Sequence, residues 1–172
     1  MKNIKTESYP TYGQVPAITD PTEIRCREDA VIKEALAILA GRLHKEDLLH
    51  ATSSNVTFDY LRLKVATREH EVFGVLFLDN QHHLLEDVEL FRGTIDGASV
   101  YPREVLKEAL RHNAAAVIFY HNHPSGLAEP SSSDDAITAR LKAALQVVEI
   151  RVLDHIIVGG LDTYSYSSHG KL

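Results

Sequence analysis

Two histidines separated by one residue follow a short apolar run in the last third of the chain. The run Val117–Tyr120 has the length and composition of a buried strand, and His121 and His123 come directly after it. Side chains alternate along an extended chain, so both imidazoles are predicted on one face, with Asn122 on the other. Pro124 has no backbone N–H and is expected to end the strand. Two imidazoles at a strand end can supply half of a tetrahedral metal site.

Asp134 is the candidate for a third ligand. Two histidines and a carboxylate are the donors of many catalytic zinc sites, which leave the fourth position open for water and lower the pKa of that water to about 7. The same segment also reads as a helix start, with Ser131 as the N-cap and Asp134 as the N3 carboxylate of a capping box. The two interpretations are compatible, because a cap can fix the backbone that presents a ligand. Without the carboxylate, the two histidines would be read as loop residues making ordinary hydrogen bonds.

The spacing of these residues resembles a known motif. A His-x-His pair, seven residues and then Ser-x-x-Asp resembles the JAMM motif of JAB/MPN metalloprotease domains, and the longer segment 121–134 resembles the bacterial RadC family. Further segments that resemble this family are Val75–Asp79, Leu90–Thr94, Tyr101–Val105, Asn113–Ala116 and Arg151–His155. The resemblance implies an α/β three-layer sandwich with a mixed sheet, the cytidine-deaminase-like JAB/MPN fold. It also implies Zn²⁺ as the cofactor and hydrolysis of peptide or isopeptide bonds as the activity.

The resemblance also suggests catalytic residues. JAMM proteins place a catalytic glutamate in an E-x-x-G/A-x-L strand, and Glu71 with Gly74 and Leu76 matches that pattern. This implies that Glu71 takes a proton from the attacking water and returns it to the leaving amine. Glu69, two residues earlier, is the fallback. Ser131 lies where JAMM enzymes keep a serine that hydrogen-bonds the developing oxyanion. Without the resemblance, Glu71 would be read as a solvent-facing strand residue.

His155 ends the RadC-like segment Arg151–His155 and lies within a predicted buried strand. We interpret it as structural, or as a partner that fixes the tautomer of a ligating histidine. His82 and His83, beside the turn of a predicted hairpin, are expected to be exposed and not to bind metal.

Charge and composition limit the partners. The formal net charge of −6 shows no basic excess of the kind that binds phosphates. The resemblance implies a peptide or protein as the substrate. One alternative is a DNA repair or recombination-associated RadC-like protein that binds nucleic acid. Another is a non-catalytic MPN scaffold, although a scaffold has no need of an intact ligand set.

The cellular location is predicted from the search for membrane spans and a signal segment. No apolar run reaches the length of a membrane span, and residues 1–7 have no hydrophobic signal core, so we expect a cytoplasmic protein. Cys26 is the single cysteine, which rules out an internal disulfide and a cysteine-based zinc site.

We divide the chain into an N-terminal arm and helix, residues 1–50, and a RadC-like JAB/MPN domain, residues 51–172. The arm extends to about residue 25, and the second predicted helix is capped by Ser54 or Asn55. The other helices are predicted at Glu28–Lys45, Pro102–His112 and Ser131–Val148. Besides the strand before His121, strands are predicted at Val72–Asp79, Leu84–Phe91, Ile150–Val158 and Tyr164–Ser167.

Overall fold

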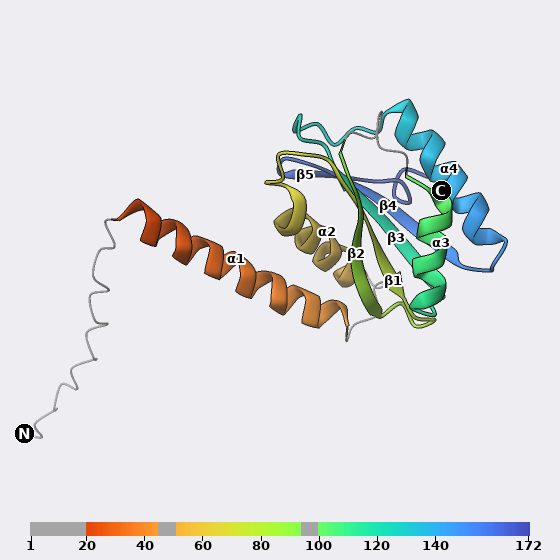
Figure 1. Cartoon of the computed structure of the whole chain (residues 1–172), viewed down its shortest axis with the longest axis horizontal. Coiled ribbons are helices and arrows are strands. Elements are labelled where there is room, and N and C mark those ends of the chain that lie inside the picture. Colours follow the sequence, from red (N-terminus) through yellow and green to blue (C-terminus); the bar gives the residue numbers. More distant parts are fainter. Residues whose placement is uncertain (1–19, 45–50, 94–99) are drawn as a thin grey trace, which may run out of the picture.

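A five-stranded mixed sheet forms the centre of the protein. The computed structural model of the chain describes residues 20–44, 51–93 and 100–172. In chain order the strands are β1 (Val72–Leu78), β2 (Leu84–Arg92), β3 (Ala116–Asn122), β4 (Arg151–Gly159) and β5 (Asp162–Ser165). Across the sheet their order is β2-β1-β3-β4-β5. Strands β3 and β4 are parallel and the other neighbours are antiparallel, so the mixed sheet predicted from the sequence is confirmed (Figure 1).

Helices cover both faces of this sheet (Figure 1). They are α1 (Pro21–Leu43), α2 (Ala51–Val65), α3 (Pro102–Arg111) and α4 (Ser132–Gln146). Leu76 and Ile118 belong to the apolar cluster that includes α2, whereas Phe77 and Phe119 belong to the cluster that includes α3 and α4. This division follows from the alternation of side chains along each strand. The predicted three-layer α/β sandwich is therefore confirmed.

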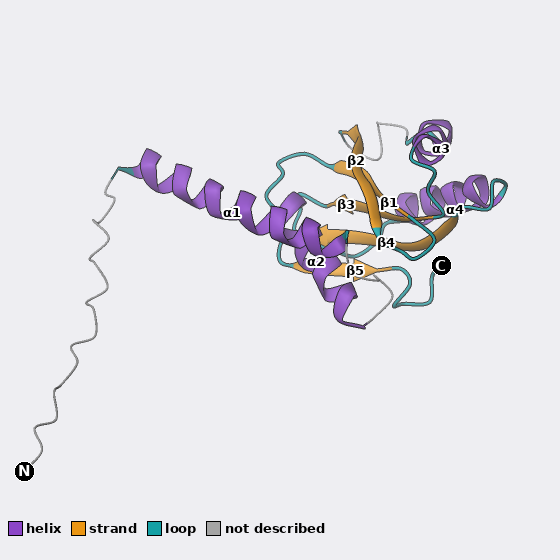
Figure 2. Cartoon of the chain, turned by 90° about the horizontal axis from the view of Figure 1, so that it is seen from below, coloured by secondary structure: helices purple, strands orange, loops and turns teal. Residues whose placement is uncertain are grey.

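Helix α1 extends well beyond the sandwich in both views (Figures 1 and 2). Its contacts with the core come from its C-terminal half, through Leu36, Leu39 and Leu43. The helix begins at Pro21, so the prediction of a start at Glu28 is wrong. A proline at the first helical position loses no hydrogen bond, and the Asp20 carboxylate caps the helix by accepting from the Thr22 N–H at 2.8 Å.

Most of the other predicted elements are found within a few residues of their expected ends. Helix α2 begins at Ala51, earlier than the predicted caps. The prediction that His82 is exposed is wrong, because its backbone adopts φ 65° in the turn and its side chain is buried. The predicted arm up to residue 19, and residue 45 at the end of the predicted helix, lie outside the described residues. No helix in the described part of the chain combines the length and apolar character needed to cross a membrane.

Helix α2 is held on the sheet by hydrogen bonds to one partly buried carboxylate. The Tyr120 hydroxyl donates to Asp87 Oδ1 at 2.7 Å, while the Tyr60 hydroxyl and the Lys64 ammonium each reach Asp87 Oδ2 at 2.5 Å. Burial, together with the charge of Asp87, raises the pKa of both tyrosines, so they remain donors. Tyr120 lies across Gly74, whose missing side chain leaves the space for the ring. The network thus joins α2 to strands β2 and β3.

Replacing Gly74 with alanine should destabilise the protein, because the new Cβ would lie 2.1 Å from Tyr120 Cζ. Tyr120 is fully buried and cannot move aside, so we expect a loss of about 1–3 kcal/mol or more in the free energy of unfolding. Urea denaturation measures this loss. The control is Gly41→Ala in α1, where no atom lies within 4 Å, and it should stabilise the helix by up to about 1 kcal/mol. Equal stability of the two variants would contradict this account of Tyr120.

Candidate metal centre

The three predicted ligands meet where β3 ends and α4 begins. His121 lies near the end of β3, His123 follows that strand, and Asp134 lies in the first turn of α4. One ligand atom from each residue lies within 4.8 Å of the others. His121 is fully buried, Asp134 is nearly so, and His123 is partly exposed. The fold thus brings together the residues that the motif singled out.

The distances between neighbouring donor atoms are close to those between the ligands of a tetrahedral metal ion. His121 Nε2 lies 3.0 Å from His123 Nε2 and 3.3 Å from Asp134 Oδ1. His123 Nε2 lies 3.5 Å from Asp134 Oδ2. Zinc bonds of about 2.0–2.2 Å at tetrahedral angles separate neighbouring ligand atoms by about 3.3–3.6 Å. The two contacts of Asp134 use different carboxylate oxygens, and with one atom from each residue the ligand atoms lie within 4.8 Å of one another. The three side chains could therefore hold a divalent ion after a modest rotation of the carboxylate or of the His123 ring.

The donor set also has the chemistry of a cation site. His123 Nδ1–H donates to the Leu127 carbonyl at 2.7 Å, so in the neutral ring the Nε2 atom that faces the cluster carries a lone pair. Asp134 Oδ1 is buried and accepts no hydrogen bond. Acceptor atoms with no donor between them repel one another unless a proton or a metal ion lies there. The residues present therefore fit a metal ion.

The pKa shifts in the cluster follow from burial and from the ion pairs. Burial lowers the pKa of His121, which favours its neutral, metal-binding form. The hydrogen bond with Asp134 raises the pKa of His123. Burial alone would raise the pKa of Asp134, but the neighbouring His121 and His123 hold it well below its usual range. Asp134 is therefore ionised, and the proton that competes with a metal resides on His123.

Ser131 and Asp134 form the capping box that the sequence also indicated. Ser131 Oγ accepts from the Asp134 N–H at 3.2 Å, while Asp134 Oδ2 accepts from both the Ser131 N–H and the Ser131 hydroxyl at 2.7 Å. The cap aims the carboxylate at the two imidazoles, because it holds one oxygen and leaves the other toward His121. The helix-cap and ligand interpretations are thus both consistent with one geometry.

Glu71 directly precedes β1, the strand beside β3. Strand β1 pairs antiparallel with β3, with Phe73 opposite His121, and continuing this register by two residues places Glu71 opposite His123. The charge of Glu71 makes a small contribution that favours the protonated form of both histidines, although burial lowers the pKa of His121 overall, and this is consistent with a position near the cluster. The fallback, Glu69, lies exposed in a bend before β1, so the extended chain assumed for it is not present.

Asn122 is a functional candidate that the sequence reasoning missed. It points to the opposite face from the histidines, where its Oδ1 accepts from the Val72 N–H at 2.8 Å. Its Nδ2 donates to the His70 carbonyl at 3.2 Å and to the Arg68 carbonyl at 3.4 Å. These contacts hold the backbone on both sides of Glu71. A buried asparagine in an apolar strand was the available signal, because such a side chain must bind other polar groups.

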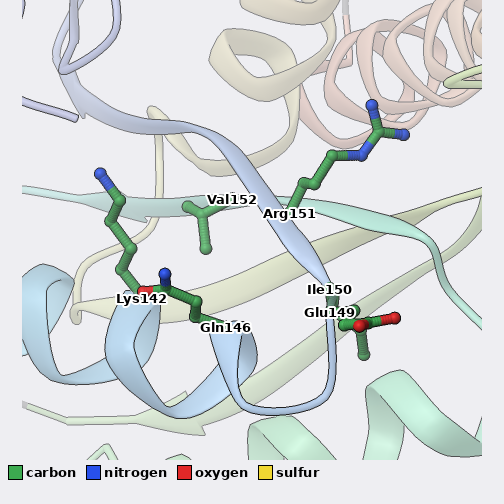
Figure 3. Close-up of a pocket in the computed structure, with 6 residues that line it drawn as sticks. All are labelled: Lys142, Gln146, Glu149, Ile150, Arg151 and Val152. Carbon is green, nitrogen blue, oxygen red and sulfur yellow. The ribbon is translucent and has the colours of Figure 1, made fainter.

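A separate hollow of about 400 Å³ lies at the other end of the sheet (Figure 3). It is lined by Lys142 and Gln146 of α4 and by residues 149–152. Arg151 pairs with Ala116 at the start of β3, whereas His121 lies near the end of that strand. This hollow is therefore remote from the metal centre.

Zinc affinity should depend on pH in a defined direction. The raised pKa of His123 means that a proton occupies its ring below that pKa, so affinity should increase about tenfold per pH unit and level off above it. Competition with a chelator between pH 6 and 8 measures this on metal-stripped protein. His123→Ala should abolish tight binding, whereas His83→Ala, at the hairpin turn, should not change it. Binding that ignores pH or survives loss of His123 would contradict the assignment.

Asn122→Ala should destabilise the protein by about 1–3 kcal/mol, because it leaves the buried Val72 N–H and the neighbouring carbonyls without their partner. Urea denaturation again provides the measurement. Asn80→Ala is the matched control, since the Asn80 side chain is exposed and should change stability by less than about 0.5 kcal/mol. A loss of the same size in both variants would show that the Asn122 contacts do not hold this segment.

Known proteins resemble the chain over most of its length. Residues 51–171 match the family of RadC-like JAB domains. A UPF0758 protein of Vibrio cholerae serotype O1 is 57% identical over 148 residues, which cover 86% of this chain and 92% of that protein. UPF0758 proteins of Nitrosococcus oceani and Cellvibrio japonicus are 59% and 54% identical, over 77% and 83% of this chain. The matched segments span only 61% and 63% of those two longer relatives. Family match, identity and fold agree, and the chain belongs to the RadC-like JAB domain family.

Proposed function

We propose that the protein is a zinc-dependent hydrolase of peptide or isopeptide bonds, a metallopeptidase of the JAMM type. The observation that carries this proposal is the convergence of His121, His123 and Asp134 at the spacing of a tetrahedral ion. Membership of the RadC-like JAB family supports it.

The ligand set favours zinc over the other common divalent ions. Imidazole nitrogens suit zinc and its transition-metal neighbours, whereas magnesium and calcium prefer sites made of oxygen atoms alone. Three protein ligands leave one coordination position open, as in catalytic zinc sites. The side chain of His123 is 14% exposed while that of His121 is fully buried, so a substrate would approach from the His123 side.

When bound, zinc would polarise the substrate carbonyl and make a water molecule more acidic. Glu71 would take the proton of the attacking water and deliver it to the leaving amine. Its position opposite His123 supports this role, because His123 is the more exposed ligand. Asn122 would hold the segment that carries Glu71 through its bonds to the neighbouring backbone.

Ser131 would stabilise the oxyanion that forms on the carbonyl. Its hydroxyl is directed to Asp134 Oδ2, so it must turn away from the carboxylate to donate to the substrate. The Ser131 N–H also binds Asp134 Oδ2 and would keep the carboxylate oriented while the hydroxyl is used. The cap therefore allows the serine to have both roles.

A nucleic-acid role predicts salt-sensitive binding that depends on basic residues. The formal net charge of −6 weighs against it, and nothing in the cluster requires a phosphate. A non-catalytic scaffold would have no use for a buried, ionised carboxylate between two imidazoles, because such a group is costly to bury. Hydrolysis is thus the function that the site supports best.

The decisive variant is Glu71→Gln, which keeps the shape of the side chain and removes its ability to accept a proton. Zinc-loaded wild-type protein should cleave members of an unbiased peptide and isopeptide library, and the variant should cleave them about 10²–10⁴-fold more slowly with zinc still bound. Glu69→Gln, two residues away and exposed, should retain full activity. Undiminished cleavage by Glu71→Gln would remove this residue from the mechanism, and an inactive zinc-loaded wild type would refute the hydrolase proposal.

A further inference from the structure

A row of hydrogen-bonded groups lies behind the ligand His121, on the side away from the cluster. His121 Nδ1 lies 2.8 Å from Nε2 of His155 on β4. His155 Nδ1 lies 2.6 Å from Oγ1 of Thr138 on α4, and the Thr138 hydroxyl donates to the Asp134 carbonyl at 2.5 Å. His155 is fully buried and Thr138 nearly so. The row thus connects the backbone carbonyl of Asp134 with the imidazole ring of His121.

The direction of each hydrogen bond follows from its chemistry. The Asp134 carbonyl can only accept, so the single hydroxyl hydrogen of Thr138 must point to it. Thr138 Oγ1 then has no hydrogen left for His155 and must accept one from His155 Nδ1–H. The hydroxyl of Tyr166 is no alternative donor to Thr138, because it donates to Asp135 Oδ1 at 2.9 Å.

The same reasoning determines which nitrogen of His121 carries the hydrogen. A fully buried His155 is neutral, so a ring with its hydrogen on Nδ1 has a lone pair on Nε2. That lone pair faces His121 Nδ1 and requires a hydrogen there. The neutral His121 ring then has its own lone pair on Nε2, the atom that faces His123 and Asp134.

We propose that Thr138 and His155 are positioning residues that form a hydrogen-bond relay, which locks His121 in the tautomer able to bind metal. The consequence for affinity rests on the metal role proposed above, whereas the tautomer itself is a property of the metal-free protein. A hydrogen bond from outside the coordination sphere often fixes a ligating histidine in this way. Here the partner is a second histidine, and its own tautomer is fixed by a helix residue one turn after Asp134.

Aromatic contacts keep the His155 ring in the orientation that the relay needs. Tyr166 stacks on it, with ring centroids 5.0 Å apart and planes at 19°. Phe73 and Phe119 contact it edge-on, each with a centroid separation of 5.8 Å. Packed in this way, the ring directs Nδ1 to Thr138 and Nε2 to His121. The relay direction is therefore set by Thr138.

The test compares Thr138→Val, which removes the hydroxyl and keeps the shape, with Thr138→Ser, which keeps the hydroxyl. Nitrogen-15 NMR of the histidine rings in metal-free protein reports which nitrogen carries the hydrogen. Wild type and Thr138→Ser should show the Nδ1–H tautomer at both His121 and His155. In Thr138→Val both rings should shift toward the Nε2–H tautomer, and zinc affinity should fall about 10–100-fold.

The outcomes distinguish a failure of the relay from a failure of the proposed metal role. An Nε2–H tautomer at His121 in metal-free wild type would overturn the relay, with no variant needed. Unchanged tautomers in a folded Thr138→Val would also overturn it, as would a Thr138→Ser variant that behaves like the valine variant. Relay tautomers in a wild-type protein that binds no zinc would refute the metal role and leave the hydrogen-bond relay intact.

Discussion

The site depends on the burial of one carboxylate, that of Asp134, between two imidazoles. An ionised carboxylate removed from water costs several kcal/mol unless hydrogen bonds and opposite charge compensate it. The capping box supplies two hydrogen bonds to Oδ2, and the two histidines add a further part of the compensation. Oδ1 accepts no hydrogen bond, so the compensation is incomplete without a cation. Elements β3 and α4 are positioned so that this one group lies against both histidine rings.

The topology of the sheet determines what surrounds His121. Its strand, β3, lies in the middle of the sheet, with antiparallel β1 on one side and parallel β4 on the other. The antiparallel neighbour brings Glu71 opposite His123, and the parallel neighbour brings His155 behind His121. The proposed general base and the proposed positioning imidazole thus approach the histidine cluster from the two strands that flank β3. Parallel pairing requires a crossover, and α4, which carries Asp134 and Thr138, is that crossover.

The sequence was informative where the interacting residues lie close together along the chain. The two histidines and the capping box lie within fourteen residues, and their spacing alone predicted that they would meet. The strands and helices followed from apolar periodicity, except where a special backbone conformation intervened, as at Pro21 and His82. The roles of Asn122 and Thr138 were not predictable in the same way. Asn122 binds backbone groups some fifty residues away in the sequence. Thr138 has the pattern of an ordinary polar helix residue, and only the fold shows its contact with His155.

The crossover has a thermodynamic consequence. The ligands come from segments that approach one another only after β3, α4 and β4 have packed together, so an unfolded chain offers no comparable site. An ion held there would be bound more tightly by the native state than by the unfolded chain, and mass action would then shift the folding equilibrium. At a free concentration a hundred times the dissociation constant, the shift amounts to about 2.7 kcal/mol. The resistance of this protein to heat would therefore depend on the concentration of free metal around it.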